Sequence, residues 1–143
     1  MEKMIWLDMD GTFVDLYGVE NWLPMLINED VTPYVVAKPL LNMNLLARLL
    51  NRAKRKGYGL GVISWTSKNG TTTYNAAVAI AKRGWLANHL RSVKFDRIDI
   101  VPYGTPKQNG RYGYLFDDEA PNRSNWKGKA YKPCELIEFL KTL

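Results

Sequence analysis

The stretch Ile5-Trp6-Leu7-Asp8-Met9-Asp10-Gly11-Thr12 decides how this chain folds. Its β-branched and aromatic run predicts a short buried strand, and the change to two aspartates and a turn-forming glycine predicts that the strand ends there. Side chains alternate along a strand, so Asp8 and Asp10 should point to the same side, with Met9 opposite. Two close carboxylates are costly unless a cation or a shared proton offsets their charge, so the spacing favours a divalent metal site over a plain polar turn.

The rest of the chain alternates helical and strand patterns. Apolar residues recur at helical spacing over residues 40–56, before Gly57, and over residues 72–90, where Gly84 could mark a break. Pro121 to Lys127 could form a short helix, and Pro133 opens a final one. Strands are predicted at residues 58–63, 95–101, 112–116 and 129–131. This alternation predicts an α/β fold, a doubly wound Rossmann-like parallel sheet flanked on both sides by helices, with ligands bound at the carboxyl ends of the strands.

Residues 13–39 are interrupted by Pro24, Pro33 and Pro39, so they cannot form one long helix. Residues 19–28 are expected to form a short helix with Pro24 in its first turn. The residues predicted to face inward from this helix are Trp22, Leu23, Leu26 and Ile27. The segment is too short for a large additional domain, so the strand ends should stay fairly open.

Length and composition limit the possible classes of protein. The chain has 143 residues, 46% hydrophobic and 12% aromatic, which predicts a single domain over residues 1–143. One cysteine, Cys134, excludes an internal disulfide and a cysteine metal cluster, which suits a reducing cytoplasm. The start reaches Asp8 too soon to hold a secretory apolar region, and no apolar run approaches membrane-spanning length, so no membrane partner is expected. The formal charge of +6 is compatible with an anionic substrate or nucleic acid.

Further polar residues follow the other predicted strands. Ser64 offers a small hydroxyl that can bond a phosphate oxygen, and Thr66 takes its place if the strand runs two residues further. Lys107 could place a positive charge beside such a group. Asp117 and Asp118 follow the strand at residues 112–116, and adjacent residues on an extended chain point opposite ways. Only one of the pair is therefore expected to contact a metal directly.

At Asp8-Met9-Asp10-Gly11-Thr12 the chain resembles the haloacid dehalogenase (HAD) superfamily, whose signature is Asp-x-Asp-Gly-Thr/Val at the end of the first strand. The resemblance implies an Mg²⁺-dependent phosphomonoesterase in which Asp8 attacks phosphorus and Asp10 acts as general acid and base. Ser64 and Lys107 match the second and third motifs of the superfamily, which hold the phosphoryl oxygens. The residues implied for Mg²⁺ are Asp8, Asp10, Asp117 and Asp118, with Asp118 favoured as the ligand of the pair.

A narrower resemblance covers residues 82–119. The run from Lys82 to Leu90 and the position of Lys107, ten residues before Asp117, are similar to the 5'(3')-deoxyribonucleotidases within the HAD superfamily. The similarity implies a small phosphorylated substrate, a nucleoside monophosphate. The chain departs from these enzymes where their helical cap should be, since residues 13–39 allow only a minimal cap.

Substrate contacts are expected at the rim of the strand ends, from Trp65, Thr66, Lys68 and Arg123. Trp65 could stack on a base or simply cover the sheet. His89, the only histidine, lies late in a predicted amphipathic helix and is expected to be structural.

Two alternatives to a nucleotidase remain open. An open basic rim would also admit the phosphorylated end of a nucleic acid, which would make the protein a polynucleotide 3'-end phosphatase. The other alternative is non-catalytic, either a nucleic-acid-binding module or a receiver-like signalling domain. A receiver carries its phosphorylated aspartate after a middle strand, whereas the acidic residues here follow the first and fourth predicted strands.

Overall fold

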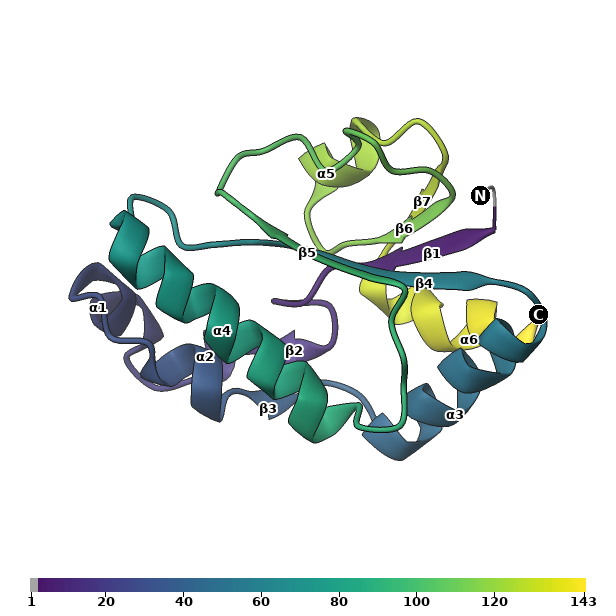
Figure 1. Cartoon of the computed structure of the whole chain (residues 1–143), viewed down its shortest axis with the longest axis horizontal. Coiled ribbons are helices and arrows are strands. Elements are labelled where there is room, and N and C mark those ends of the chain that lie inside the picture. Colours follow the sequence, from purple (N-terminus) through teal and green to yellow (C-terminus); the bar gives the residue numbers. More distant parts are fainter. Residues whose placement is uncertain (1–2) are drawn as a thin grey trace.

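The computed structural model describes residues 3–143 and is built on a sheet of five parallel strands (Figure 1). Along the sheet the strands run in the order β5-β4-β1-β6-β7. Their bounds are β1 Met4–Leu7, β4 Gly59–Trp65, β5 Arg97–Val101, β6 Tyr114–Phe116 and β7 Lys129–Tyr131. The predicted parallel Rossmann-like sheet is confirmed. Because β1 is central, with later strands added on both sides, its carboxyl end lies where ligands bind in folds of this kind.

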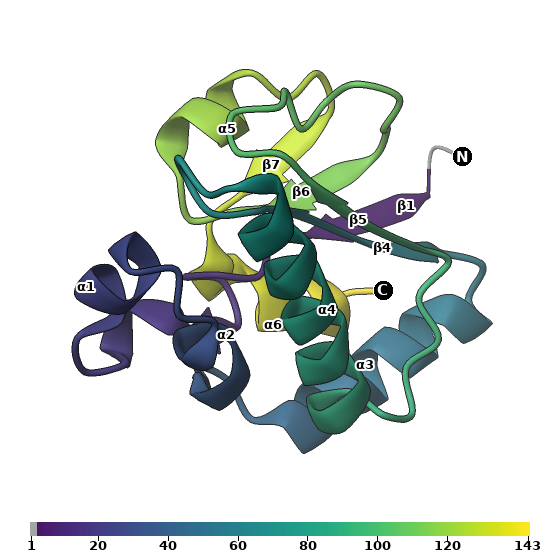
Figure 2. The same cartoon turned by 60° about the vertical axis from the view of Figure 1, so that its left-hand side comes forward.

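The helices are distributed unequally over the two faces of the sheet. Helices α3 (Met43–Arg55), α4 (Thr72–His89) and α6 (Leu136–Lys141) lie on one face, and α5 (Ala120–Ser124) lies on the other (Figures 1 and 2). The main core fills the first face, whereas a small cluster covers the second. This cluster consists of Trp6, Ile63, Leu115 and Trp126. The second face lacks a long helix because residues 102–113 contain glycines with positive φ, at Gly104, Gly110 and Gly113, and form a loop.

The predicted elements are present with shifted ends. Helix α3 begins after Asn42, whose side chain accepts a hydrogen bond from the Leu45 amide at 3.1 Å, and the chain leaves it through Gly57 with a φ of 96°. Helix α4 runs through Gly84 without a break. At its end His89 stacks on Trp85, with ring centroids 3.9 Å apart, as expected for a structural histidine.

Within residues 3–143, no helix combines the length and apolar character needed to cross a membrane.

Strand β4 extends two residues beyond the predicted end at Ile63. It does so because Ser64 and Trp65 pair with Ile100 and Val101 of β5. Ser64 therefore lies within the strand, and Thr66, the first residue after it, takes the position predicted for the hydroxyl at the strand end.

Residues 14–39 form a small lobe beside the carboxyl ends of the strands (Figure 2). At the base of the lobe, β2 (Val14–Asp15) and β3 (Lys38–Pro39) form an antiparallel pair that is separate from the main sheet. Between them lie a 3₁₀ turn (Leu16–Gly18), helix α1 (Trp22–Ile27) and helix α2 (Thr32–Val36). The prediction that α1 faces inward is confirmed only in part. Leu26 packs against a buried cluster that includes Leu16 and Tyr34, but no residue of the helix is fully buried and Ile27 is 72% exposed. It is α2 that packs against α4, and α1 lies over a cavity instead.

Candidate active site

Asp8 is the first residue after β1, and the fold fixes both of its carboxylate oxygens. Thr12 Oγ1 donates to Asp8 Oδ2 at 3.0 Å, and Lys107 Nζ donates to Asp8 Oδ1 at 2.7 Å. Met9 is buried in the core, whereas Asp8 and Asp10 both line the cavity at the strand ends. The predicted alternation along this stretch is therefore confirmed.

Lys107 joins Asp8 to Asp117, across the ends of the neighbouring strands β1 and β6. Its ammonium lies 2.7 Å from Asp8 Oδ1 and 2.7 Å from Asp117 Oδ2, and the lysine is 5% exposed. Burial alone would lower the pKa of Lys107, but the two carboxylates more than offset this, and its pKa is raised above its ordinary value. Asp117 also accepts hydrogen bonds from the Glu119 amide at 2.9 Å and the Asn122 side chain at 3.2 Å. The hydrogen-bonding capacity of its carboxylate is thus largely used by the protein.

Asp118 faces the turn that follows β1. Gly11 has a φ of 83°, and a β-carbon built on it would lie 2.1 Å from Asp118 Oδ2. A side chain at position 11 would therefore displace the Asp118 carboxylate. The glycine of the Asp-Met-Asp-Gly-Thr stretch is required both by its backbone conformation and by this close approach.

Three of the predicted metal-binding residues converge. Asp8, Asp117 and Asp118 each offer one oxygen, and the three atoms lie within 4.8 Å of one another. Burial raises the pKa of Asp8 well above its ordinary value, against the effect of Lys107, and the charge of Asp117 adds to the rise. Burial likewise raises the pKa of Asp118. Among the described residues, the ion pairs of these three carboxylates involve one cation, Lys107, and carboxylate oxygens are the ligands that hard divalent cations prefer.

The Asp10 carboxylate is not part of this group. It pairs instead with Lys82 of α4, whose Nζ lies 2.7 Å from Asp10 Oδ2. The same ammonium donates to Ser64 Oγ at 2.7 Å and to the Trp65 carbonyl at 2.8 Å. Sequence reasoning gave Lys82 no role at the site. The available signal was its position between Val78 and Trp85 on the apolar face of α4, where a lysine is buried.

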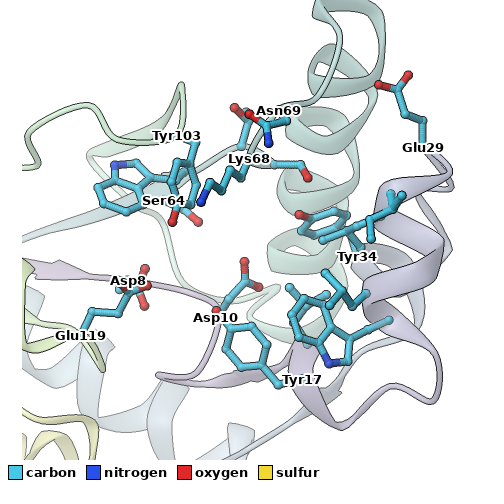
Figure 3. Close-up of a pocket in the computed structure, with 18 of the residues that line it drawn as sticks. Asp8, Asp10, Tyr17, Glu29, Tyr34, Ser64, Lys68, Asn69, Tyr103 and Glu119 are labelled. Carbon is cyan, nitrogen blue, oxygen red and sulfur yellow. The ribbon is translucent and has the colours of Figure 1, made fainter.

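A cavity of about 430 Å³ lies in front of Asp8 and Asp10 (Figure 3). Tyr17 and Tyr34 of the small lobe lie on one side of it, with Lys68 and Tyr103 opposite. The lobe supplies a largely apolar wall, made of Leu16, Tyr17, Trp22, Leu23, Leu26, Ile27 and Tyr34. The carboxyl ends of the strands therefore have a wall on one side, although the short length of residues 13–39 predicted a fairly open site.

The predicted substrate-contacting residues are only partly brought together. Trp65, Thr66 and Lys68 line the cavity with Ser64 and Lys107. Arg123 is not among the lining residues, because its guanidinium donates to the Asp117 carbonyl at 3.0 Å and supports the acidic loop instead.

The Trp65 side chain is held on several sides. Its indole NH donates to the Thr105 carbonyl at 2.8 Å, and its ring lies 4.9 Å from that of Tyr103. The Lys107 ammonium lies 5.1 Å from the centre of the indole ring. Trp65 thus packs beside the lysine that contacts Asp8, while it also lines the cavity. Tyr103, which sequence reasoning did not single out, is the more exposed of the two aromatic residues.

No protein-family model and no curated protein matches this sequence. The chemistry available at the site is therefore inferred from its own side chains. They offer a carboxylate fixed by a lysine, a second carboxylate held by another lysine, hydroxyl groups at the end of β4 and three converging carboxylates, all beside one cavity.

Proposed function

We propose that this chain is an Mg²⁺-dependent phosphomonoesterase of the HAD type, with Asp8 as its nucleophile. The observation that carries the proposal is the bridge from Asp8 through Lys107 to Asp117, with both contacts 2.7 Å long. The bridge stands at the ends of adjacent central strands, beside a cavity that also contains Asp10 and Ser64. A fixed carboxylate next to a buried cation suits covalent phosphoryl transfer, because the cation stabilises the charge on the transferring group.

In the proposed reaction, Asp8 attacks the phosphorus atom of a phosphate monoester. A bond forms between Asp8 and phosphorus as the bond to the ester oxygen breaks, and Asp10 gives a proton to the leaving alcohol. Asp10 then takes a proton from a water molecule that attacks the phosphoaspartate, which releases inorganic phosphate and restores Asp8. One difficult displacement is thereby divided into two easier ones.

The remaining residues bind and neutralise the phosphoryl group. Lys107 lines the cavity beside Asp8, and Thr66, the first residue after β4, offers its hydroxyl to a phosphoryl oxygen, whereas Ser64 Oγ is bonded by Lys82. Asp8 and Asp118 would hold Mg²⁺, since their oxygens converge beside Asp117, whose own carboxylate is largely occupied by Lys107, Glu119 and Asn122. When bound, the cation would neutralise charge on the phosphoryl oxygens.

The cavity supports a nucleoside monophosphate as substrate. Its volume of about 430 Å³ is in the range of small-molecule sites. The carboxylates lie at one side and aromatic residues line the walls, including Trp22 and Tyr17, whose rings meet edge to face at 5.0 Å. A phosphate at Asp8 and a base against the aromatic wall would use both features. The apolar lobe beside the strand ends leaves less room for the polynucleotide end that the alternative hypothesis requires.

The test is a hydrolysis screen of the purified protein with Mg²⁺ and with EDTA. The panel contains p-nitrophenyl phosphate, 5'- and 3'-deoxyribonucleoside monophosphates, sugar phosphates and a 3'-phosphorylated oligonucleotide. We expect Mg²⁺-dependent release of phosphate, fastest from a mononucleotide. Fastest release from the oligonucleotide would favour end processing. Oligonucleotide binding without any hydrolysis, or a stable phosphoprotein formed from acetyl phosphate, would favour the non-catalytic alternatives.

A further inference from the structure

Lys82 is a buried lysine with no part in the reaction outlined above. It lies within α4, 2% exposed, between Val78 and Trp85 on the face that packs into the protein. Burying an ammonium group costs several kcal/mol unless a carboxylate and further acceptors surround it. Its contacts supply this compensation, with Asp10 Oδ2 and Ser64 Oγ at 2.7 Å and the Trp65 carbonyl at 2.8 Å.

These contacts use the full hydrogen-bonding capacity of the ammonium. A lysine carries three donor protons and no acceptor, and each proton has a partner here. Lys82 is also not among the residues that line the cavity. Lys107 differs on both counts, since it lines the cavity and its ammonium bonds only Asp8 and Asp117 within the described chain. A phosphoryl group can therefore take a proton donor from Lys107, whereas Lys82 would have to give up a partner first.

We propose that Lys82 is a positioning residue that fixes Asp10 for the reaction without touching the substrate. This inference rests on the proposed function, because it assigns the lysine a role in that same site. With Oδ2 held by Lys82, the other oxygen of Asp10 is the one presented for proton transfer. Ser64 Oγ also accepts from Lys82 and holds the lysine against β4. One side chain of α4 thus connects the turn after β1 to strand β4.

The main test compares Lys82→Met with the parent protein on two esters. A 5'-deoxyribonucleoside monophosphate releases an alcohol that needs a proton, whereas p-nitrophenyl phosphate releases a stable phenolate that does not. We expect kcat/KM for the nucleotide to fall about 100-fold, since general acid catalysis contributes at least that much, and the loss for p-nitrophenyl phosphate to be at least tenfold smaller. Inhibition by inorganic phosphate should change less than about threefold.

Arg83→Met is the matched control. It removes a cation from the next residue of the same helix, where the guanidinium is exposed and donates to the Ile98 carbonyl, and should leave both esters unaffected. Equal losses on the two esters in Lys82→Met, or a loss of phosphate inhibition that matches the loss of kcat/KM, would overturn the positioning role. A parent protein inactive on both esters would contradict the proposed function itself, which separates the two failures.

A second comparison remains valid if Lys82→Met alone folds poorly. Lys82→Met leaves the Asp10 carboxylate without its cation. The double variant, Lys82→Met with Asp10→Asn, removes that unpaired charge, so it should unfold at a higher temperature than Lys82→Met alone. If Lys82 acts through Asp10, the double variant should hydrolyse the nucleotide no more slowly than Asp10→Asn. A further tenfold loss in the double variant would show that Lys82 acts independently of Asp10 and would refute the inference.

Discussion

Lys107 Nζ and Asp117 Oδ2 lie 2.7 Å apart, in an ion pair whose two side chains are 4% and 0% exposed. The neighbouring Asp118 has a different environment, half-buried against Gly11 at the turn after β1. The two adjacent carboxylates are therefore suited to different tasks. Asp117 fixes the lysine of the site, and Asp118 is the carboxylate of the pair that we propose for the cation.

Substitution of each member of the pair should separate these tasks. Asp117→Asn leaves Lys107 with one carboxylate in a buried site, so we expect the free energy of unfolding to fall by about 3 kcal/mol. Asp118→Asn should change stability little and should abolish activation by Mg²⁺. Urea unfolding and an Mg²⁺ titration of activity measure the two effects. If Asp118→Asn kept its Mg²⁺ dependence while a folded Asp117→Asn lost it, the assignment of the two residues would have to be exchanged.

The nucleophile is tested by Asp8→Asn. The amide keeps the size of the side chain and can still accept from Thr12, but it cannot form an acyl phosphate, so hydrolysis should fall to background. Phosphate release and trapping of the phosphoprotein by acid quench measure the effect, and circular dichroism checks the fold. Full activity in a folded Asp8→Asn protein would eliminate the aspartyl-phosphate mechanism.

The raised pKa values of Asp8 and Asp118 predict how pH changes stability. A carboxyl group with a higher pKa in the folded than in the unfolded protein stabilises the fold fully below its ordinary value of 3.8, and this contribution is lost as pH rises through the folded pKa. A cation competes with the same protons. The increase in Tm caused by Mg²⁺ should therefore grow from acid to neutral pH, and Asp118→Asn should reduce it. Differential scanning calorimetry with Mg²⁺ or EDTA measures this, and an increase independent of pH would argue against a cation at these carboxylates.

Trp22 tests whether the small lobe contacts the substrate. Trp22 is partly buried and packs edge to face on Tyr17, so Trp22→Ala should lower Tm somewhat, and the comparison of two substrates separates this effect from binding. Loss of a stacking surface is worth about 1–3 kcal/mol per base, so KM for a nucleotide should rise about tenfold, while KM for p-nitrophenyl phosphate should not. Tyr112→Ala, which removes an exposed aromatic residue outside the cavity, is the control. An unchanged KM for the nucleotide would place the base elsewhere.

Trp65 distinguishes stacking from packing on the opposite wall. If its ring contacts a base, Trp65→Ala should raise KM for nucleotides much more than KM for p-nitrophenyl phosphate. If it only supports Lys107 and Tyr103, kcat should fall by the same factor for both substrates. Steady-state kinetics on the two esters decides between these roles.

The positions that sequence reasoning predicted well depend on local rules. Side-chain alternation placed Asp8 and Asp10 toward one cavity, and the shared edge of parallel strands brought Lys107 and Asp117 to Asp8. These rules need only the location of the strand ends, which the change from apolar to acidic residues marks clearly.

The positions that were missed depend on contacts distant in sequence. Lys82 contacts Asp10, which lies 72 positions earlier in the chain. The helical pattern does not show which residue the lysine side chain contacts. Arg123 was expected at the rim, but it turns back to the Asp117 carbonyl. Ile27 was expected in the core because it is apolar, yet it lines the cavity at the strand ends and is 72% exposed.

The β2–β3 pair marks the two points between which the small lobe could be replaced. Val14 lies opposite Pro39 and Asp15 opposite Lys38, so the chain leaves the body of the protein and returns to it at neighbouring points. Between these points the lobe is held to the rest of the protein through α2, which packs against α4. Under the proposed function, a different lobe grafted onto the same two residue pairs, with the α2 contact kept, should change the choice of substrate while the reacting groups stay in place.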